Sequence, residues 1–465
     1  MWKLFFEEGS LILETPRELT SEEQSNLPKE LIWDERVKRF RARGCDYRVV
    51  RTWVHRLGVD YEDDAANYNK LDLEQHLKRD PRDYQKEGIE NWIKYGKKGL
   101  ILLPTGTGKS YVAQMAMVEV QRSTLIVAPT IDLMNQWYEI LTSAFQVPVG
   151  LLGGGYHEVE DLTVSTYDSA YIHMDRLGNR FGLVIFDEVH HLPSTSYLHA
   201  AECCIAPFRL GLTATLERPD DRHLLLDDVL GKVVYRRSIR ELAGEYLADY
   251  EVERIVVNLT EEEANTYHSN REIYRDFVRS RGIRMSGPKG WGEFISMSSR
   301  SIEGRRAMKA YQRARRIALS APSKLRDLEG LLRLHSKDRV IIFTNDNDSV
   351  YRISRSFLIP AITHQTDAKE RRELLKRFNE GTYPCLVTSR VLNEGVNIPE
   401  ANVGIVLSGT GSVREHVQRL GRILRQQPGK KAILYEVITD QTLEHFVSER
   451  RREHDAYRNE NNMNK

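Results

Sequence analysis

The alternation of short apolar runs with helical patterns constrains the fold of this chain more than any other feature. The first series of runs covers 99–103, 123–128, 162–165, 183–186 and 208–213, and the second covers 340–344, 361–363, 385–388, 403–407 and 431–437. A strand has a continuously apolar sequence when it belongs to a parallel sheet whose two faces are both covered by helices. The sequence therefore predicts an α/β protein with two parallel-sheet domains.

The remaining segments suggest a division of the chain. Residues 1–72 combine short β-like stretches with one helical pattern, which predicts a small α+β module. The acidic stretch 60–64 and the AANYNK that follows it, at 65–70, are expected to be a linker. The helical, basic segment 261–317 is expected to be an insertion. About three domains suit a chain of 465 residues. We expect the module 1–72, a first α/β domain 73–238, a second α/β domain 239–440 that carries the insertion, and a tail 441–465.

Composition and cysteine usage argue against several classes of protein. With 40% hydrophobic and 29% charged residues, the chain has the balance of a soluble globular protein. It lacks a run of about 18 apolar residues, and Glu7 and Glu8 occupy the place where a signal peptide needs its apolar region. Without C-x-x-C spacing, the cysteines are expected to be reduced, mostly buried thiols (Cys45, Cys203, Cys204 and Cys385). We expect a cytoplasmic protein with no membrane partner.

Positive charge is concentrated in two segments, although the formal net charge is only +1. Residues 36–56 have a local charge of +7, from eight basic residues and one acid. Residues 271–316 have a local charge of +9, from thirteen basic residues and four acids. Such segments are typical of contacts with nucleic-acid phosphates. For 36–56 the alternative is an ordinary exposed helix.

A glycine-rich loop follows the first apolar run and opens a helical pattern, the context that a phosphate-binding loop requires. Its glycines let backbone N–H groups converge on phosphates, Lys109 can neutralise phosphate oxygens, and Ser110 can ligate Mg²⁺. The strict pattern has glycine where Leu103 stands, but the T-G-x-G-K-S core is intact. We expect ATP and Mg²⁺ to bind here, at Thr105, Gly106, Thr107, Gly108, Lys109 and Ser110.

Two acidic residues follow the run 183–186. Asp187 and Glu188 are expected at the carboxyl end of a parallel strand, where Mg²⁺ and an attacking water must be held. We expect Asp187 to hold Mg²⁺, directly or through water, and Glu188 to orient or deprotonate the water. An Asp-Glu pair alone fits a plain strand end, but the phosphate loop at this spacing favours the catalytic interpretation.

Thr213 and Thr215, in the motif LTAT, are candidates for coupling nucleotide chemistry to movement. Their hydroxyl groups can relay hydrogen bonds from a phosphate site, or they can simply cap a helix. His190 either links the acidic pair to these threonines or is a structural histidine.

A basic motif far along the chain is a candidate for completing an ATP site. Gln418, Arg422 and Arg425 lie on one helical face. An arginine that enters an ATP site from a second domain stabilises transition-state charge. On its own, this helix would fit a solvated basic face.

The motifs taken together resemble those of superfamily 2 helicases. From Tyr84 to Arg425 they are, in order, YQ, PTGTGKS, VAPTIDLMNQW, VSTYDSA, DEVHH, LTAT, VIIFTND, VTSRVLNEGVNIP and QRLGRILR. DEVHH, the GLTATLERPDDRH context and SVREHVQRLGRILR resemble the XPB family of DNA-repair ATPases in its short archaeal form.

The resemblance implies two RecA-like domains with ATP in their cleft. Gln85 would read adenine, and Arg422 and Arg425 would act across the cleft. The module 1–72 would resemble a mismatch-recognition fold assigned to damage sensing, and a helical thumb at 261–317 would grip DNA. The implied function is an ATP-dependent DNA helicase or translocase with 3′ to 5′ polarity in nucleotide excision repair, with a separate partner endonuclease.

Two motifs depart from the family pattern. The Arg-Glu-Asp element after LTAT reads R-P-D, so Arg218 and Asp220 remain candidate DNA contacts but the charged middle residue is absent. Motif V, at 393–397, has amides in place of two carboxylates. Glu394 and Gly395 remain candidates for coupling, because amides preserve hydrogen bonding but not charge.

In the insertion, Arg271, Arg275 and Arg279 repeat at four-residue spacing and form one basic stripe. Cations meet phosphates and aromatic faces stack on bases, which is how single strands are bound. The alternative for the arginines is a solvated face. In either case we expect some of the interleaved aromatic residues to form the core of the thumb (Tyr274, Phe277, Trp291, Phe294 and Tyr311).

Two other functions fit these motifs. One is an ATP-gated platform that opens duplex DNA and recruits a nuclease with little processive unwinding, which the proline in R-P-D favours. The other is an RNA helicase of the DEAH type, which the LTATLERPDDRH context and the thumb disfavour. We expect single-stranded and forked DNA as partners, a nucleoid-associated protein, and a monomer.

Overall fold

The computed structural model describes residues 1–76, 79–216, 220–247, 250–285, 289–389, 401–408 and 432–444. The chain divides into two compact units, Met1–Ser238 and Ile239–Lys465, and each is described by itself. Both contain a sheet of parallel strands, which confirms the predicted α/β class. None of the described helices is long and apolar enough to cross a membrane.

An eight-stranded sheet of order β13-β6-β12-β11-β7-β10-β8-β9 lies at the centre of the first unit. Its strands are β6 (Lys98–Leu102), β7 (Thr124–Ala128), β8 (Val149–Gly153), β9 (Tyr156–His157), β10 (Leu162–Thr166), β11 (Leu183–Asp187), β12 (Phe208–Thr213) and β13 (Val233–Arg236). Neighbouring strands run parallel, except that β9 is antiparallel to β8.

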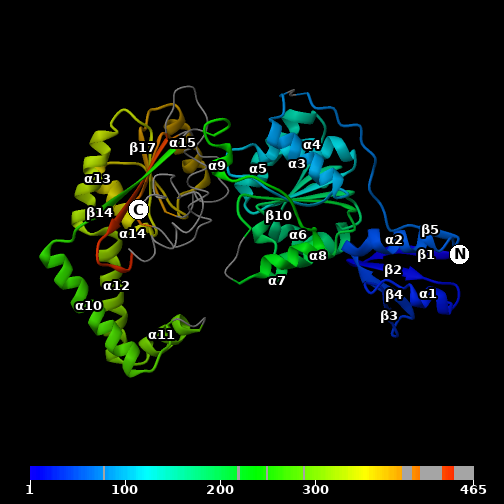
Figure 1. Ribbon diagram of the computed structural model, residues 1–465, viewed down its shortest axis with the longest axis horizontal. Coiled ribbons are helices and arrows are strands. Elements are labelled where there is room, and N and C mark those ends of the chain that lie inside the picture. The colour runs from blue at the N-terminus through cyan, green and yellow to red at the C-terminus, as the bar shows by residue number, and fades with distance from the viewer. Residues whose placement is uncertain are drawn as a thin grey trace, which may run out of the picture. The chain divides into compact units, whose positions relative to one another are not determined.

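Helices cover both faces of this sheet (Figure 1). On one face lie α3 (Asp83–Lys94), α4 (Lys109–Val120) and α5 (Ile131–Phe145), and on the other lie α6 (Tyr167–Leu177), α7 (Thr195–Glu202) and α8 (Leu226–Val229). Two short 3-10 helices are η2 (Val189–His191) and η3 (Arg222–Leu225). Because no face of the central strands meets water, their sequences are continuously apolar.

The strand order brings three predicted strand ends together. β12 pairs with β6 on one side, where Thr213 lies opposite Leu102. It pairs with β11 on the other side, where Leu212 lies opposite Asp187. Carboxyl ends of parallel strands share one edge of a sheet, so the phosphate loop, the acidic pair and LTAT meet there.

Within the module expected at 1–72, the first 63 residues form a separate five-stranded sheet of order β3-β4-β2-β1-β5. Its elements are β1 (Trp2–Glu7), β2 (Ser10–Glu14), α1 (Ser21–Ser25), β3 (Ile32–Asp34), β4 (Arg39–Arg43), η1 (Gly44–Asp46), α2 (Tyr47–Arg56) and β5 (Tyr61–Asp63). Only β1 and β5 pair in parallel; the other pairs are antiparallel.

Part of the stretch that was expected to be a linker is strand β5, so the expectation is wrong for residues 61–63. Tyr61 pairs with Trp2 in the sheet. Asp63 accepts a hydrogen bond from the Tyr47 hydroxyl at 2.7 Å and forms an ion pair with Arg51 at 3.0 Å. The acid is therefore neutralised by the neighbouring helix α2, a contact that local composition does not reveal.

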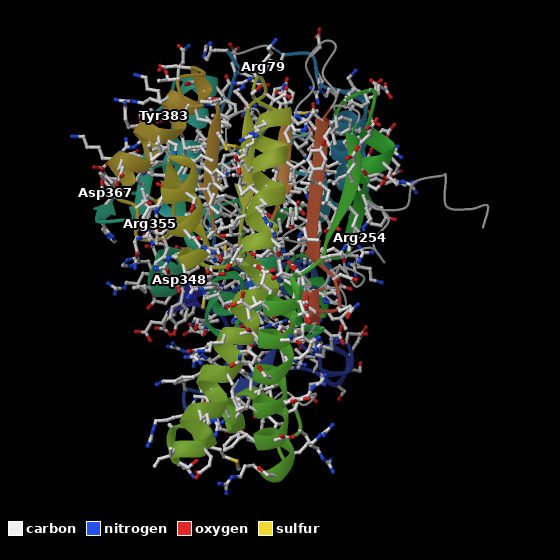
Figure 2. All side chains as sticks on the ribbon, turned by 90° about the vertical axis from the view of Figure 1, so that its left-hand side faces the viewer. Arg79, Arg254, Asp348, Arg355, Asp367 and Tyr383 are labelled. Atoms are coloured by element: carbon white, nitrogen blue, oxygen red, sulfur yellow. The ribbon has the colours of Figure 1, made fainter. Side chains whose placement is uncertain are left out.

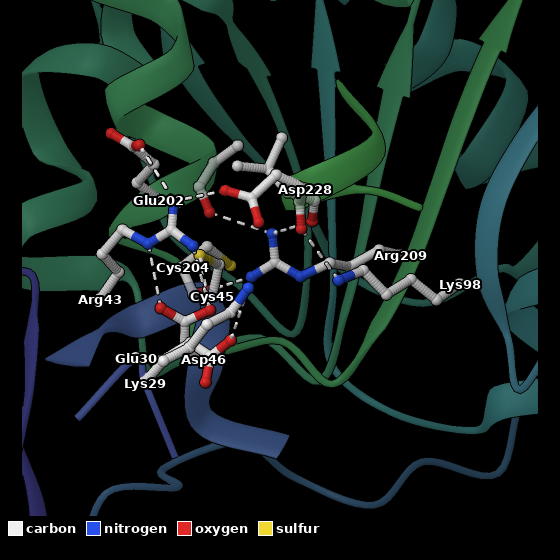
Figure 3. Close-up of polar contacts among 12 residues, drawn as sticks. Lys29, Glu30, Arg43, Cys45, Asp46, Lys98, Glu202, Cys204, Arg209 and Asp228 are labelled. Atoms are coloured by element: carbon white, nitrogen blue, oxygen red, sulfur yellow. Dashed lines mark hydrogen bonds and ion pairs between the residues drawn. The ribbon is translucent and has the colours of Figure 1, made fainter. Parts of the chain in front are cut away.

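The module packs against the eight-stranded domain at the end of β4 (Figure 3). Arg43 Nη1 lies 2.6 Å from Asp228 Oδ2 and 3.5 Å from Glu202 Oε1. A Cβ atom on Gly44 would lie only 2.5 Å from the Cys203 carbonyl oxygen, so a larger residue would separate the two surfaces. The cysteines were predicted to be mostly buried, and Cys45, Cys203 and Cys204 are buried, whereas Cys385 is half-buried.

The second unit contains a six-stranded, fully parallel sheet of order β14-β19-β18-β15-β17-β16. Its strands are β14 (Tyr250–Val257), β15 (Val340–Phe343), β16 (Ala361–Ile362), β17 (Cys385–Thr388), β18 (Val403–Val406) and β19 (Ala432–Thr439). The helices that accompany it are α9 (Ile239–Leu242), α13 (Pro322–Leu334), α14 (Asn347–Phe357) and α15 (Ala368–Asn379).

Three helices form the segment expected to be an insertion, and we call them the thumb. They are α10 (Glu261–Ser280), α11 (Gly290–Ser299) and α12 (Ile302–Ser320). Figure 2 shows α10 and α12 running side by side away from the six-stranded sheet. At the root of the thumb, the Thr439 hydroxyl donates to the Ala318 carbonyl at 2.7 Å, and a buried ion pair joins Lys324 to Glu444 at 2.5 Å.

Candidate functional site

The phosphate loop connects β6 to the first turn of α4. Gly106 and Gly108 have φ angles of +85° and +81°, a region that favours glycine. A Cβ atom on Gly108 would lie 2.7 Å from Gln85 Nε2, so steric space as well as backbone conformation requires glycine. The loop ends where α4 begins at Lys109, and its backbone N–H groups therefore belong to a helix N-terminus that favours anions.

Helix α3 fixes the loop from one side. The Thr107 carbonyl accepts hydrogen bonds from the Tyr84 hydroxyl at 2.6 Å and from Gln85 Nε2 at 2.9 Å. Gln85 Oε1 in turn accepts from the Arg82 backbone N–H at 3.0 Å. Gln85 thus holds the phosphate loop in place through hydrogen bonds, and its expected contact with adenine remains a prediction.

Lys109 and Glu188 face each other across the site. Lys109 Nζ lies 3.9 Å from Glu188 Oε1 and donates to the Leu103 carbonyl at 3.3 Å. Both side chains are almost buried, at 11% and 13% exposure, so their charges are only weakly screened by solvent. An arriving phosphate would give the Lys109 ammonium an anion to neutralise.

The residues present fit ATP and Mg²⁺. Thr105 Oγ1 is buried and has no hydrogen-bond partner among the described residues. That hydroxyl, the Lys109 ammonium and the first N–H groups of α4 together offer the donors that a triphosphate requires. No cluster of three or more His, Cys, Asp or Glu side chains suited to a metal occurs in the described part of the chain. Mg²⁺ is usually held by one or two protein groups together with water and phosphate oxygens, and Ser110 and Asp187 are the groups that would hold it here.

Asp187 ends strand β11 with both carboxylate oxygens hydrogen-bonded. Its Oδ2 accepts from Trp137 Nε1 at 2.8 Å, and its Oδ1 accepts from the Glu188 backbone N–H at 3.0 Å. Burial raises the pKa of the Asp187 carboxyl, and the charge of Glu188 raises it further, whereas Lys109 acts in the opposite direction. A bound cation would favour the ionised form.

Glu188 has a left-handed backbone conformation, with φ at +46°. Non-glycine residues adopt it at a cost of about 1 kcal/mol or more, and such strain concentrates at functional sites. The preceding peptide is held by the buried Tyr167, whose hydroxyl donates to the Asp187 carbonyl at 3.0 Å. The surrounding structure thus fixes the direction in which Glu188 leaves the strand.

His190 and Thr213, two of the predicted coupling residues, are connected through their side chains, whereas the buried Thr215 hydroxyl has no hydrogen-bond partner among the described residues. His190 Nδ1 lies 2.9 Å from Thr213 Oγ1 and 3.4 Å from Glu188 Oε2. Thr213 Oγ1 also lies 2.9 Å from the Thr215 carbonyl oxygen. A continuous chain of polar contacts therefore connects Glu188 with LTAT through His190 and Thr213.

Several predicted site residues cannot be placed. Arg218, Glu394, Gly395, Gln418, Arg422 and Arg425 lie outside the described residues, as do residues 445–465 of the tail. Asp220 is exposed, and its carboxylate accepts from the Arg222 backbone N–H at 3.3 Å.

The arginine stripe lies on α10. Arg275 and Arg279 are exposed, while Arg271 is half-buried with its guanidinium 5.6 Å from the centre of the Tyr274 ring. Of the interleaved aromatic residues, Tyr274, Phe277 and Phe294 are buried in the thumb core, and Trp291 is 41% exposed. The expectation that some of these residues are core is confirmed.

The sequence analysis missed two sets of residues. One is the pair of buried aromatic donors to the end of β11, Trp137 in the middle of α5 and Tyr167 at the first residue of α6. A polar aromatic residue inside or at the start of a helical pattern is the only local signal. The other is a basic cavity of about 660 Å³ where α12 meets the first turn of α14. Asp348 marks this turn in Figure 2. The cations that line the cavity are Lys309, Arg313, Arg315, Arg316 and Arg352.

Three family models match the chain. The model for the "Xeroderma pigmentosum group B helicase damage recognition domain" matches residues 4–65. The models for "Type III restriction enzyme, res subunit" and "Helicase conserved C-terminal domain" match residues 78–218 and 323–427.

Curated proteins from all three domains of life are similar to this chain. The DNA 3'-5' translocase XPB2 of Sulfurisphaera tokodaii is 40% identical over 423 residues, which cover 91% of this chain and 96% of that protein. The DNA 3'-5' helicase XPB of Mycobacterium tuberculosis is 28% identical over 378 residues, which cover 78% of this chain and 61% of that protein. The general transcription and DNA repair factor IIH helicase/translocase subunit XPB/SSL2 of Saccharomyces cerevisiae is 25% identical over 448 residues, covering 89% of this chain and 47% of that protein.

Two solved structures show the same fold. The Hef helicase domain of Pyrococcus furiosus aligns with a TM-score of 0.54 at 21% identity, covering 79% of this chain and 97% of that chain. Dbp5 of Saccharomyces cerevisiae, bound to RNA and ADP BeF3, aligns with a TM-score of 0.55 at 14% identity, covering 82% of this chain and 88% of that chain. At these identities the similarity shows the fold, which is that of two RecA-like helicase domains.

Proposed function

Because this chain belongs to the XPB family of superfamily 2 helicases, we propose that it is an ATP-dependent DNA helicase or translocase that moves 3′ to 5′ and acts in nucleotide excision repair. The observation that carries the proposal is the meeting of the phosphate loop, the acidic pair and LTAT at the carboxyl edge of one sheet. That edge is where open parallel sheets bind ligands.

Within this proposal, each predicted ATP-site and coupling residue named below has a chemical role. Lys109 neutralises the phosphate oxygens, and Ser110 and Asp187 hold the metal. Bound Mg²⁺ neutralises charge that develops on the phosphates. Glu188 orients the attacking water or takes its proton. His190, Thr213 and Thr215 pass a change at Glu188 to the rest of the sheet edge through the contacts described above.

The remaining predicted residues complete the proposal. Arg422, Arg425 and Gln418 would enter the ATP site from the second α/β domain, with Glu394 and Gly395 coupling nucleotide state to DNA. We assign the second α/β domain to 239–440 and damage recognition to the module 1–72. As DNA contacts we assign the thumb stripe of Arg271, Arg275 and Arg279, together with Arg218 and Asp220.

We also propose a separate repair endonuclease as partner, because a chain that opens DNA needs another activity to cut it. The protein acts as a monomer, associated with the nucleoid. Size measurement by light scattering, alone and with forked DNA, tests the monomer: a dimer in both conditions would contradict it.

Steady-state ATP hydrolysis tests the function, measured without nucleic acid and with single-stranded DNA, forked duplex DNA or single-stranded RNA. Strand separation on the fork is followed in parallel. We expect stimulation by DNA with unwinding of the fork. DNA stimulation without unwinding would indicate the ATP-gated platform, and equal or stronger stimulation by RNA would contradict the DNA-repair function.

Two substitutions test the assigned chemistry in the same assay. Lys109→Ala should reduce hydrolysis at least about a hundredfold, because the site loses its phosphate-facing cation. Glu188→Gln should still bind ATP but hydrolyse it at a similarly reduced rate. Lys94→Ala, which removes an exposed lysine from α3, is the matched control and should retain normal turnover. Near-normal hydrolysis by Glu188→Gln would contradict the role of Glu188.

A further inference from the structure

Trp137 makes an unusual contact for a tryptophan in the middle of an amphipathic helix. Its side chain is only 3% exposed, and its indole N–H donates to the Asp187 carboxylate at 2.8 Å. The other carboxylate oxygen accepts from the Glu188 backbone N–H at 3.0 Å. Because each oxygen has its own donor, the plane of the Asp187 carboxylate cannot rotate without breaking a buried hydrogen bond.

The elements that carry Trp137 are well fixed. Helix α5 begins after β7, where Thr130 caps it by accepting from the Leu133 N–H at 3.2 Å. Strand β7 pairs directly with β11, which ends at Asp187. The donor and the acceptor are therefore held by neighbouring strands of one sheet and by the helix that follows one of them.

The energetic cost of losing this contact falls on Asp187. A buried oxygen without its donor bears a desolvation penalty, and a hydrogen bond to a charged group is stronger than one between neutral groups. Partners that orient a metal-binding side chain typically change metal affinity or activity by about 10-fold to 100-fold when they are removed. A simple packing role would instead change stability alone.

We propose that Trp137 is a positioning residue for magnesium: its indole N–H fixes the Asp187 carboxylate in the orientation that receives the ion. The inference rests on the proposed magnesium role of Asp187. It assigns a function to α5, which otherwise only covers the sheet, and it makes the position of that helix a determinant of metal binding.

The test measures nucleotide binding rather than turnover. A fluorescent ADP analogue, N-methylanthraniloyl-ADP, is titrated with the full chain at a series of Mg²⁺ concentrations and in EDTA. For Trp137→Phe, which removes the N–H but keeps an aromatic ring, the Mg²⁺ concentration giving half of the metal-dependent gain in affinity should rise about tenfold. Affinity in EDTA should stay within about twofold of the unsubstituted protein, because the phosphate loop is untouched.

Trp92→Phe is the matched control. Trp92 is fully buried in α3, and its indole N–H donates to the Arg209 carbonyl at 2.9 Å, far along the sheet from Asp187. Both substitutions remove one indole hydrogen bond and the same ring volume, so any general loss of stability is shared. Only Trp137→Phe should change the magnesium dependence; an equal response of the two variants overturns the inference.

Two further variants distinguish a failure of the Trp137 role from a failure of the magnesium role of Asp187. Replacement of Trp137 by 3-benzothienylalanine keeps the ring shape but removes the N–H. This variant should show the same shift in magnesium dependence even where Trp137→Phe folds poorly. An unchanged magnesium dependence overturns the inference. Asp187→Asn should shift the magnesium dependence at least as far. If Asp187→Asn shifts it and neither Trp137 variant does, only the positioning role fails; if Asp187→Asn does not shift it, the magnesium role of Asp187 fails as well.

Discussion

The module and the thumb each contain a strongly basic segment, but the fold uses the two differently. Residues 36–56 and 271–316 have local charges of +7 and +9, and sequence alone gives little reason to separate them. In the module most of these arginines contact an acceptor within the folded chain. Among the described residues, none of the thumb arginines on α10 or α12 forms an ion pair, although Arg305 donates to the Ser299 carbonyl at 3.3 Å. Local charge therefore does not identify a nucleic-acid surface until the carboxylates within reach are known.

Acidic residues scattered along the first unit neutralise the basic run of the module. Arg39 lies 2.7 Å from Glu14, and Arg51 lies 3.0 Å from Asp63. Arg48 donates to the Gly96 carbonyl at 2.7 Å, which adds a second link between module and domain. The alternative of one exposed helix is wrong, because the run is split between strand β4 and helix α2, and DNA contact by this run stays a prediction.

Three aromatic residues of the thumb are buried, and two arginines of its stripe are exposed. Tyr274, Phe277 and Phe294 form the small core between its helices, which leaves Arg275 and Arg279 in water. Unpaired cations keep their counterions until a phosphate replaces them, and the release of those ions drives binding. The thumb is therefore the better candidate for DNA contact.

The largest effect that separates the two segments is expected at Arg43. Arg43→Met removes the cation shared by Asp46, Glu202 and Asp228, and leaves Asp46 buried without it. Leaving a buried acceptor without its partner costs about 1–3 kcal/mol. Hydrogen exchange of the α2 and β4 amides in the full chain should show this loss as faster opening. Arg36→Met, at an arginine whose side chain is 83% exposed, is the control and should leave the exchange of these amides nearly unchanged. Equal effects would mean that the interface contact adds nothing.

DNA affinity provides the second test. Arg275→Ala combined with Arg279→Ala should weaken binding to single-stranded DNA about tenfold and reduce the salt slope by about 1.4, from two lost phosphate contacts. The matched pair in the module, Arg36→Ala with Arg39→Ala, also removes two cations and should leave the slope nearly unchanged. Binding is measured by fluorescence anisotropy over a range of salt concentrations. A larger slope change in the module pair would reverse the comparison.

Sequence patterns predicted those parts of the molecule that depend on local order. The phosphate loop and the residues around Asp187 and Thr213 were found because each follows a continuous apolar strand, and parallel pairing then brings the strand ends together. Strand β5 was missed because its residues Tyr61, Glu62 and Asp63 contain no apolar run; it is a strand only through pairing with β1. The contact of Trp137 with Asp187 spans 50 positions, and no local pattern indicates which buried residue will carry the donor.

The smallest effect is expected at Asp34, and it bears directly on whether the module's charges are paired in solution. Arg36 donates to both Asp34 oxygens, at 3.0 and 2.9 Å, and this hydrogen bonding lowers the pKa of the Asp34 carboxyl to about 2. Because the folded value lies below the usual one, the contribution of the pair to stability is complete above about pH 4 and is lost as the pH falls toward 2. Carbon-13 NMR of protein labelled at the aspartate carboxyl carbons should give a midpoint near 2 for Asp34, and Arg36→Ala should return it toward its usual range. A titration midpoint in the usual range for aspartate in the unsubstituted protein would mean that Arg36 does not pair with Asp34 in solution. The module would then have one fewer arginine paired with a carboxylate, and its difference from the thumb would be smaller.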